Sequence, residues 1–478
     1  MRFAPSLTIN SSMPLGLYIS VPFCRTKCSY CNFASDVFSK SAYENYVARL
    51  LEDIANSRQL ASDLGCAFEE SADSIYLGGG TPSILDASHL QRIFAALRSH
   101  FRFTHDAEIT VECAPGTLTP AFIDTLLLCG VNRVSLGVQS FIDREAQAVG
   151  RLHKRAMVLE EIGRLRDAGH GNINIDLIAG LPHQTIESWA FSVSETIATR
   201  VPHASVYMLE VDNDSRLGRE LIAGGARYHA HFVPDDDAIA DFYQQACESL
   251  GSAGLAQYEI SNFARRPVPL CDEELQCNKS RHNLKYWTRQ PYLGFGVDAH
   301  SMLLTHNHEV ERPRAIRFAT ADSLDAYMNR APHRVTPVSA VAAIEESFFL
   351  GLRLNSGMDL EQLRKEFSAG LEPASLLNMN CHLNMNCHPE QSEGPAVRQP
   401  SARSAPLSSR FRTTVGQDPI VEWDSVVDRC VQDGLLEKQG ATVRLTGRGR
   451  LLSNEVFARF LIQETAETKV GTGHVKSR

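Results

Sequence analysis

A regular alternation of short β-rich runs with longer helical stretches, from Leu15 to about Val211, constrains the fold of this chain most strongly. The runs are rich in Val, Ile or Tyr, and each is followed by Gly, Pro or polar residues, as is typical of strands that enter loops. The predicted strands are Leu17–Val21, Ser74–Leu77, Glu108–Glu112, Arg133–Gly137, Asn172–Ile178 and Ser205–Leu209. Helices are predicted between them, at about 43–54, 87–101, 120–129, 156–168 and 186–199. Such βα repeats predict an α/β fold with a parallel barrel or partial barrel, and a doubly wound open sheet is the competing layout.

The unusual residues of this region follow the predicted strands, which favours the barrel. Glycines and a proline at 78–82 follow the second strand, and Glu112 ends the third. Gln139 follows the fourth strand, and Asp176 lies within the fifth. Because barrel enzymes build their sites at the carboxyl ends of the strands, we expect one site there.

Three cysteines in a CxxxCxxC pattern follow the first predicted strand, and they are Cys24, Cys28 and Cys31. Three thiolates can hold three corners of a four-iron cluster and leave the fourth iron open to a small molecule. A closed zinc site is the alternative, but it needs a fourth ligand, and the next residues offer only Asp36. The spacing therefore predicts a [4Fe-4S] cluster with an open iron.

The composition bounds what else the chain can be. A length of 478 residues is too great for one ordinary core and predicts two domains with an insertion. A net charge of −9 argues against wholesale nucleic-acid binding. Twelve cysteines without a small-domain framework, and a start without a signal-peptide pattern, predict a reducing cytoplasm.

The cysteine loop, the glycine run at 78–80 and the later strand ends resemble the radical S-adenosylmethionine (SAM) superfamily. The branch resembled is that of the oxygen-independent coproporphyrinogen III dehydrogenases, and within it the HemW family of heme chaperones. The resemblance rests on six sequence segments, at 18–24, 77–83, 135–141, 176–182, 258–263 and 281–287. It spans about residues 15–360 and resumes near the carboxyl terminus. It implies contacts with SAM by Tyr18, Tyr30, Gly79, Gly80, Thr81, Glu112, Gln139, Arg151 and Asp176.

Two features favour the chaperones over the dehydrogenases. The dehydrogenases carry a further cysteine two residues past the third cluster ligand, where this chain has Phe33. The resemblance also associates an HNxxYW signature with heme binding, which here is His282, Asn283, Tyr286 and Trp287. The residues alone favour a buried histidine packed among core aromatics, and the resemblance reverses that preference.

The remaining organisation is predicted from periodicity and composition. We expect a leader at 1–14, a partial barrel of six βα units at 15–235, a barrel extension with the HNxxYW motif at 236–320 and the helical start of a C-terminal domain at 321–375. A Pro- and Ser-rich stretch preceded by a repeated Asn-Met-Asn-Cys-His unit predicts a disordered insertion at 376–415. A winged-helix-like end at 416–465 and a loose tail at 466–478 complete the expected organisation.

The function expected from the resemblance is a heme chaperone that holds a [4Fe-4S] cluster, SAM and heme. The expected partners are heme and heme-receiving apo-proteins, with membrane-bound respiratory enzymes and a second copy of the chain as candidates. Oxidative decarboxylation of coproporphyrinogen III is the enzymatic alternative. A DNA-binding regulator that senses its cluster is a third, and it rests on the winged-helix pattern alone.

Overall fold

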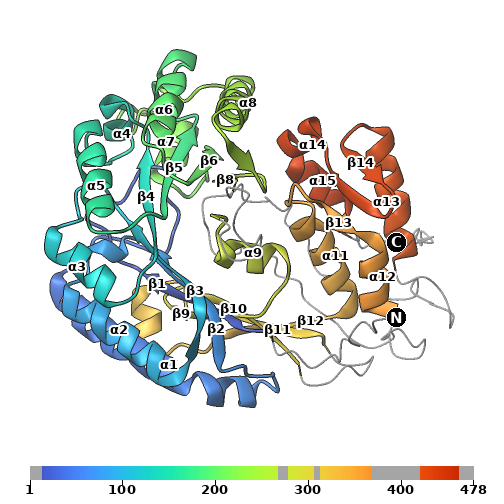
Figure 1. Cartoon of the computed structure of the whole chain (residues 1–478), viewed down its shortest axis with the longest axis horizontal. Helices are drawn as coiled ribbons and strands as arrows, with labels where there is room; N and C mark the ends of the chain where they lie inside the picture. The colour runs from blue at the N-terminus through green and yellow to red at the C-terminus, as the bar shows by residue number, and fades with distance from the viewer. Residues whose placement is uncertain (1–12, 267–277, 306–312, 369–419, 462–478) are drawn as a thin grey trace, which may run out of the picture.

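The computed structural model describes residues 13–266, 278–305, 313–368 and 420–461. Its centre is a set of six parallel strands that pair in chain order, with helices along their outer side (Figure 1). Each predicted strand overlaps one of them, which confirms the α/β fold class. The strands are β1 (Leu15–Val21), β2 (Ser71–Gly79), β3 (Arg102–Cys113), β4 (Arg133–Gln139), β5 (Ile173–Ala179) and β6 (His203–Met208).

Two of the crossover helices, α3 and α6, begin at residues whose side chains accept from the first backbone amides. Thr119 accepts from Phe122 N at the start of α3, and Thr185 and Ser188 form a reciprocal capping box at the start of α6. The short α4 was not predicted, since six residues give too little periodicity. The helices are α1 (Lys40–Asp63), α2 (Ala87–His100), α3 (Pro120–Leu128), α4 (Asp143–Ala148), α5 (Arg155–Asp167), α6 (Ile186–Ala198), α7 (Arg216–Ala223) and α8 (Asp236–Ser252).

The sheet continues beyond the six strands at both edges and has twelve strands among the described residues. At one edge β9 (Tyr292–Gly296) pairs in parallel with β1, and β10 (His300–Leu304), β11 (Ala315–Ala319) and β12 (Arg334–Val338) follow as antiparallel strands. At the other edge β8 (Asn262–Arg265) and β7 (Leu255–Gln257) follow β6. The sheet therefore extends to Val338, past residue 320, where we expected the helical part to begin.

The inner side of the barrel is polar, unlike the branched apolar filling of ordinary barrels. Asn174 of β5 donates to Ser135 Oγ of β4 at 2.7 Å and to Ser205 Oγ of β6 at 3.0 Å. His203 Nδ1 lies 2.6 Å from Asn174 Oδ1. Apolar side chains at the alternate positions, such as Ile175, pack instead in the main hydrophobic core. The inner side of the barrel therefore offers polar side chains that can contact a bound ligand.

A second hydrophobic core lies in the C-terminal part and includes Tyr286 and Trp287 of α9 (Arg281–Trp287). Figure 1 shows α9 between the barrel and the C-terminal helices. As predicted, a hairpin turns at Gly440, and Thr446 accepts from Gly449 N at the start of a helix. The hairpin forms a three-stranded sheet in the order β13-β15-β14. The elements are α11 (Ala340–Gly351), β13 (Met358–Asp359), α12 (Leu360–Ser368), α13 (Val421–Gln432), β14 (Leu436–Gln439), β15 (Thr442–Leu445), α14 (Gly447–Leu451) and α15 (Ser453–Arg459).

The predicted insertion at 376–415, the tail at 466–478 and most of the leader lie outside the described residues. Among the helices that the structure describes, none has both the length and the apolar character needed to cross a membrane.

Candidate functional site

The loop after β1 carries the three predicted cluster ligands, Cys24, Cys28 and Cys31. Lys27 holds the loop closed, because its Nζ donates to the carbonyls of Phe33 at 2.9 Å and Ser35 at 2.7 Å. The thiol of Cys24 is also in contact with the hydroxyls of Ser35 at 3.5 Å and Thr81 at 3.9 Å. A cationic side chain and two hydroxyls beside the thiols suit thiolate ligands.

The thiols do not converge on a single point. Across the described ranges, no three His, Cys, Asp or Glu side chains are grouped so that they could hold one metal ion. A four-iron cluster needs no such convergence, because each thiolate binds a different iron. Burial raises the pKa of Cys24, and it raises the pKa of Cys31 to about 12. Both thiols are therefore protonated at neutral pH, and any metal that they bind must displace those protons.

The cysteine loop borders an open cavity at the carboxyl ends of the strands. Every predicted SAM residue except Tyr18 lines it, together with the three cysteines. Its walls come from the ends of β2 to β6 and from the loops that follow them. The lining residues are Cys24, Thr26, Lys27, Cys28, Tyr30, Cys31, Phe33, Ser35, Tyr76, Gly79, Gly80, Thr81, Glu112, Cys113, Ala114, Ser135, Gly137, Gln139, Arg151, Asp176 and Tyr207.

The glycine run after β2 packs directly on the backbone that leads into the cysteine loop. Gly80 N donates to Val21 O at 2.7 Å, and Thr81 N donates to Phe23 O at 2.8 Å. A Cβ atom on Gly80 would lie 2.6 Å from Phe23 O, which is too close for any side chain. Gly79 has a φ of +97°, a conformation that glycine adopts without strain. The run therefore has to be glycine for the two loops to meet.

Polar groups line the opposite wall. Arg151 Nη2 donates to the hydroxyl of Tyr30 at 3.0 Å, which joins the loop after α4 to the cysteine loop. Gln139 has a φ of +68°, and its buried Oε1 has no hydrogen-bond partner among the described residues. A buried carbonyl without a partner costs free energy unless a ligand or water satisfies it. Gln139 is therefore suited to contact a bound ligand.

Two carboxylates reach the cavity, one from β3 and one from β5, with β4 between them. Glu112 accepts a hydrogen bond from the hydroxyl of Tyr76 at 2.8 Å. Asp176 accepts from Ser135 at 3.0 Å and from Asn174 at 2.6 Å. Burial raises the pKa of Asp176, although these hydrogen bonds oppose the shift. Carboxylates, amides and a guanidinium in one cavity can bind an amino acid and the hydroxyls of a ribose.

Tyr18, the remaining predicted SAM residue, lies deeper in the barrel. Its side chain is buried and stacks on Tyr76, with ring centroids 6.1 Å apart, and on His282, at 6.2 Å. The cavity lining does not include it. The structure thus brings Tyr18 to the aromatic rings behind the cavity.

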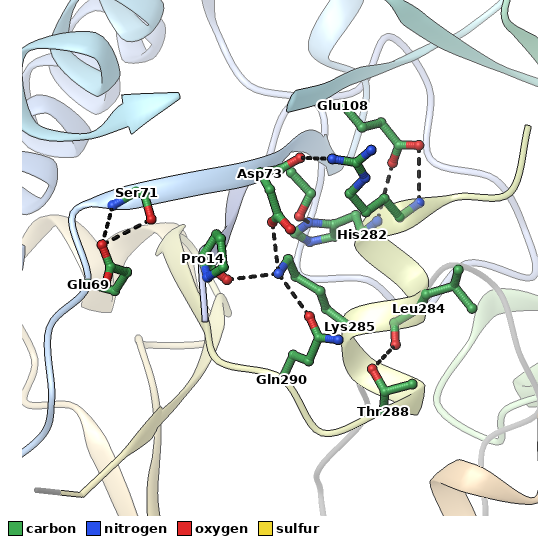
Figure 2. A network of polar contacts seen from close by, with 12 residues as sticks. Pro14, Glu69, Ser71, Asp73, Glu108, His282, Leu284, Lys285, Thr288 and Gln290 are labelled. Carbon is green, nitrogen blue, oxygen red and sulfur yellow. Dashed lines mark hydrogen bonds and ion pairs between the residues drawn. The ribbon is translucent and has the colours of Figure 1, made fainter. Parts of the chain in front are cut away.

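The HNxxYW motif forms α9, near the amino-terminal ends of the strands. His282 Nδ1 lies 3.1 Å from Ser74 Oγ, which precedes the glycine run on β2. Glu108 accepts from the backbone amide of His282 at 3.2 Å (Figure 2). The motif and the cavity therefore lie at different depths of the same barrel.

Both ring nitrogens of His282 have partners, since Nε2 lies 2.8 Å from the hydroxyl of Tyr286. The side chain is 1% exposed, and burial lowers its pKa to about 3, so that the imidazole is neutral. The other candidates, Asn283, Tyr286 and Trp287, are buried as well. In this arrangement His282 has no nitrogen available to a metal, and an approaching heme iron would first have to displace Tyr286.

Sequence reasoning missed the group that fixes α9 to the barrel. Lys285 is buried, its Nζ forms an ion pair with Asp73 at 2.8 Å, and it donates to Pro14 O at 2.8 Å and Gln290 Oε1 at 3.1 Å (Figure 2). A Cβ atom on Gly16 would lie 2.9 Å from Lys285 Cδ, so the second residue of β1 is a glycine where the lysine side chain passes. A lysine inside a helix normally indicates a solvent-facing position, and no pattern in the sequence reveals that this one is buried.

Comparison with known proteins shows which proteins the chain is related to. The family model of the radical SAM superfamily matches residues 18–193. The heme chaperone HemW of Lactococcus lactis subsp. lactis is 32% identical over 364 residues, which cover 75% of this chain and 86% of that protein. The heme chaperone HemW of Escherichia coli is 34% identical over 289 residues, which cover 60% and 70%.

Among solved structures, the coproporphyrinogen III oxidase HemN of Escherichia coli, a radical SAM enzyme, matches with a TM-score of 0.69. The match covers 94% of this chain and 90% of that chain at 21% identity. At 21% identity this match shows a shared fold. Family membership is shown by the relatives that are 32% and 34% identical.

Proposed function

The chain belongs to the HemW family of the radical SAM superfamily, and on that premise we propose that it is a heme chaperone. In this proposal it binds heme, holds a [4Fe-4S] cluster with SAM, and delivers heme to apo-proteins. The observation that carries the proposal is the similarity to the HemW of Lactococcus lactis, which extends over 86% of that protein. The gathering of cysteines and predicted SAM residues around one cavity supports the cofactor part.

We assign the cluster to Cys24, Cys28 and Cys31. The donor set fits, because three thiolates on different irons leave one iron open for a further ligand. Lys27 supports the assignment, since it ties the loop together through two carbonyls. Phe33 lines the cavity where the dehydrogenases of this branch carry another cysteine, which favours the chaperone.

We assign SAM to the cavity beside this loop, with Tyr30, Gly79, Gly80, Thr81, Glu112, Gln139, Arg151 and Asp176 around it. The buried Oε1 of Gln139 and the side-chain-free Gly80 support this assignment, because one offers an unused acceptor and the other a close backbone approach. When bound, SAM would supply the ligand of the open iron. Tyr18 then belongs to the wall behind the cavity.

We place the heme-binding candidates, His282, Asn283, Tyr286 and Trp287, on α9. Their burial means that heme binding at this motif requires α9 or Tyr286 to move. The recipients would be apo-proteins, with membrane-bound respiratory enzymes as candidates, and a second copy of the chain is a candidate partner. Such a chaperone would act in the cytoplasm, where reduced thiols and the cluster persist.

The deciding experiment is anaerobic and uses the full chain with a reconstituted cluster. Heme and coproporphyrinogen III are offered in parallel, with SAM and a reductant present. Stoichiometric heme binding without protoporphyrinogen formation is expected. Catalytic loss of two carboxylates would contradict the chaperone proposal and show that the chain is a dehydrogenase.

A further inference from the structure

Tyr76 joins the wall of the cavity to the aromatic residues behind it. Its hydroxyl donates to Glu112 Oε1 at 2.8 Å, and both residues line the cavity. They lie on adjacent parallel strands, since Tyr76 is opposite Thr110 in the register of β2 and β3. Neither the cysteine pattern nor the glycine run points to this tyrosine.

The ring of Tyr76 is held on two sides. Tyr18 stacks on it with centroids 6.1 Å apart and planes at 19°, and His282 stacks at 5.3 Å and 26°. Only 7% of the residue is exposed. A ring fixed in this way gives its hydroxyl one position, so the hydrogen bond to Glu112 constrains the carboxylate.

Gly78 makes room for the pair. A Cβ atom on Gly78 would lie 2.9 Å from Tyr76 Cε1 and 3.0 Å from Glu112 Cδ. Gly78 therefore leaves space for the side chains of Tyr76 and Glu112, whereas Gly80 leaves space for the backbone that leads into the cysteine loop. The same short segment fixes both sides of the cavity.

We propose that Tyr76 is a positioning residue, which orients the Glu112 carboxylate toward the cationic or hydroxyl groups of SAM. This inference rests on the proposed function, because it assumes that SAM occupies the cavity. An ionised carboxylate accepts several hydrogen bonds, so the bond from Tyr76 leaves Glu112 able to contact a ligand.

The protonation state of Tyr76 supports the same role. Burial raises the pKa of the Tyr76 hydroxyl well above its usual value, and the nearby Glu112 adds to the shift. The hydroxyl therefore keeps its proton at any working pH and acts toward Glu112 as a donor.

The test measures the affinity for SAM of the full chain with a reduced, reconstituted cluster. SAM is titrated while the electron paramagnetic resonance spectrum of the cluster is recorded. Tyr76→Phe keeps the stacked ring and removes only the hydroxyl, and we expect about tenfold weaker SAM binding, the size of one hydrogen bond to a charged group. Glu112→Gln is expected to weaken binding more.

The double variant separates positioning from a direct contact. If Tyr76 acts through Glu112, Tyr76→Phe combined with Glu112→Gln binds SAM no more weakly than Glu112→Gln alone. Losses that multiply in the double variant would overturn the inference, since Tyr76 would then act independently of Glu112.

Tyr243→Phe is the matched control. This buried tyrosine of α8 also loses hydrogen bonds, to Ile260 O at 2.5 Å and from Gln257 Nε2 at 2.7 Å, but it does not line the cavity. We expect unchanged SAM affinity, with iron content equal to that of Tyr76→Phe. If Tyr76→Phe and the control bind SAM equally well, the positioning role of Tyr76 is overturned and the proposed function is unaffected. Failure of the unsubstituted protein to bind SAM would overturn the cofactor proposal and the role of Tyr76 with it.

Discussion

The ring of Tyr76 stacks on the ring of His282, with their centroids 5.3 Å apart. Tyr76 ends in a hydrogen bond to Glu112 at the cavity, and His282 begins the HNxxYW motif on α9. One tyrosine side chain therefore spans the barrel between the residues that we assign to SAM and those that we assign to heme. The two proposed sites thus have Tyr76 in common.

Cys28→Ser should abolish the cluster, because two thiolates cannot replace the three that the proposal requires. The measurement is iron and sulfide content, with visible absorption, after anaerobic reconstitution. Cys247→Ser is the control, since Cys247 is a free thiol on α8 outside the cavity lining, and it should keep full iron. Full iron in Cys28→Ser would refute the assignment of the ligand.

Gly80→Ala should impair the cluster and destabilise the fold. The new methyl group would meet the carbonyl oxygens of Phe23 at 2.6 Å and Val21 at 2.8 Å, and backbone atoms cannot step aside cheaply. We expect a loss of about 1–3 kcal/mol, measured by denaturant unfolding, together with reduced iron content. The control Gly163→Ala on α5 meets no atom within 4 Å and should stabilise by about 0.5–1 kcal/mol. Normal iron and stability in Gly80→Ala would contradict the close packing of the two loops.

Substitutions at His282 and Tyr286 should change heme affinity in opposite directions. His282→Ala removes the proposed ligand and should weaken heme binding. Tyr286→Phe frees His282 Nε2 from its 2.8 Å contact and should strengthen binding about fivefold, the net value of one hydrogen bond. Heme titration followed by absorbance measures both. Unchanged affinity in both variants would place the heme elsewhere.

His282 should make stability depend on pH. Burial lowers its pKa to about 3, so between pH 6.5 and 3 the unfolded chain binds a proton that the folded chain does not. This contribution to stability is complete above about pH 6.5, and it decreases as the pH falls, by at most about 1.4 kcal/mol per pH unit. The His282→Asn variant lacks this contribution. The difference in melting temperature between the unsubstituted protein and His282→Asn should therefore narrow from pH 7 to pH 5. A gap that stays constant would mean that His282 takes up its proton inside the fold.

Lys285→Met should destabilise the protein by about 3 kcal/mol, the lower end for a buried ion pair, because it leaves the Asp73 carboxylate, whose side chain is 20% exposed, without its cation. Adding Asp73→Asn should recover part of the loss. Lys438→Met is the control, since its ion pair with Asp428 is exposed and 3.9 Å long, and the melting temperature should not change. Equal effects of the two methionine variants would show that Lys285 is not a buried anchor.

The six parallel strands and five of their helices could be predicted because each has its own periodicity. The edge strands could not be predicted in the same way. The short β7 and β8 have too few residues for a pattern, and β9 joins β1 although more than two hundred residues separate them in the chain. Pairing at that distance depends on which edges remain open once the barrel has formed.

The sequence by itself determined the cysteine loop, the glycine run and the polar strand ends, because close backbone approach and metal ligation restrict the residue types at fixed spacings. The resemblance added the individual cavity residues. Only the tertiary structure decided that Tyr18 stands behind the cavity, that His282 has both nitrogens engaged, and that Lys285 is buried. Except for the contact of His282 with Tyr286 inside α9, these contacts join residues that are far apart in the chain, so local spacing cannot predict them.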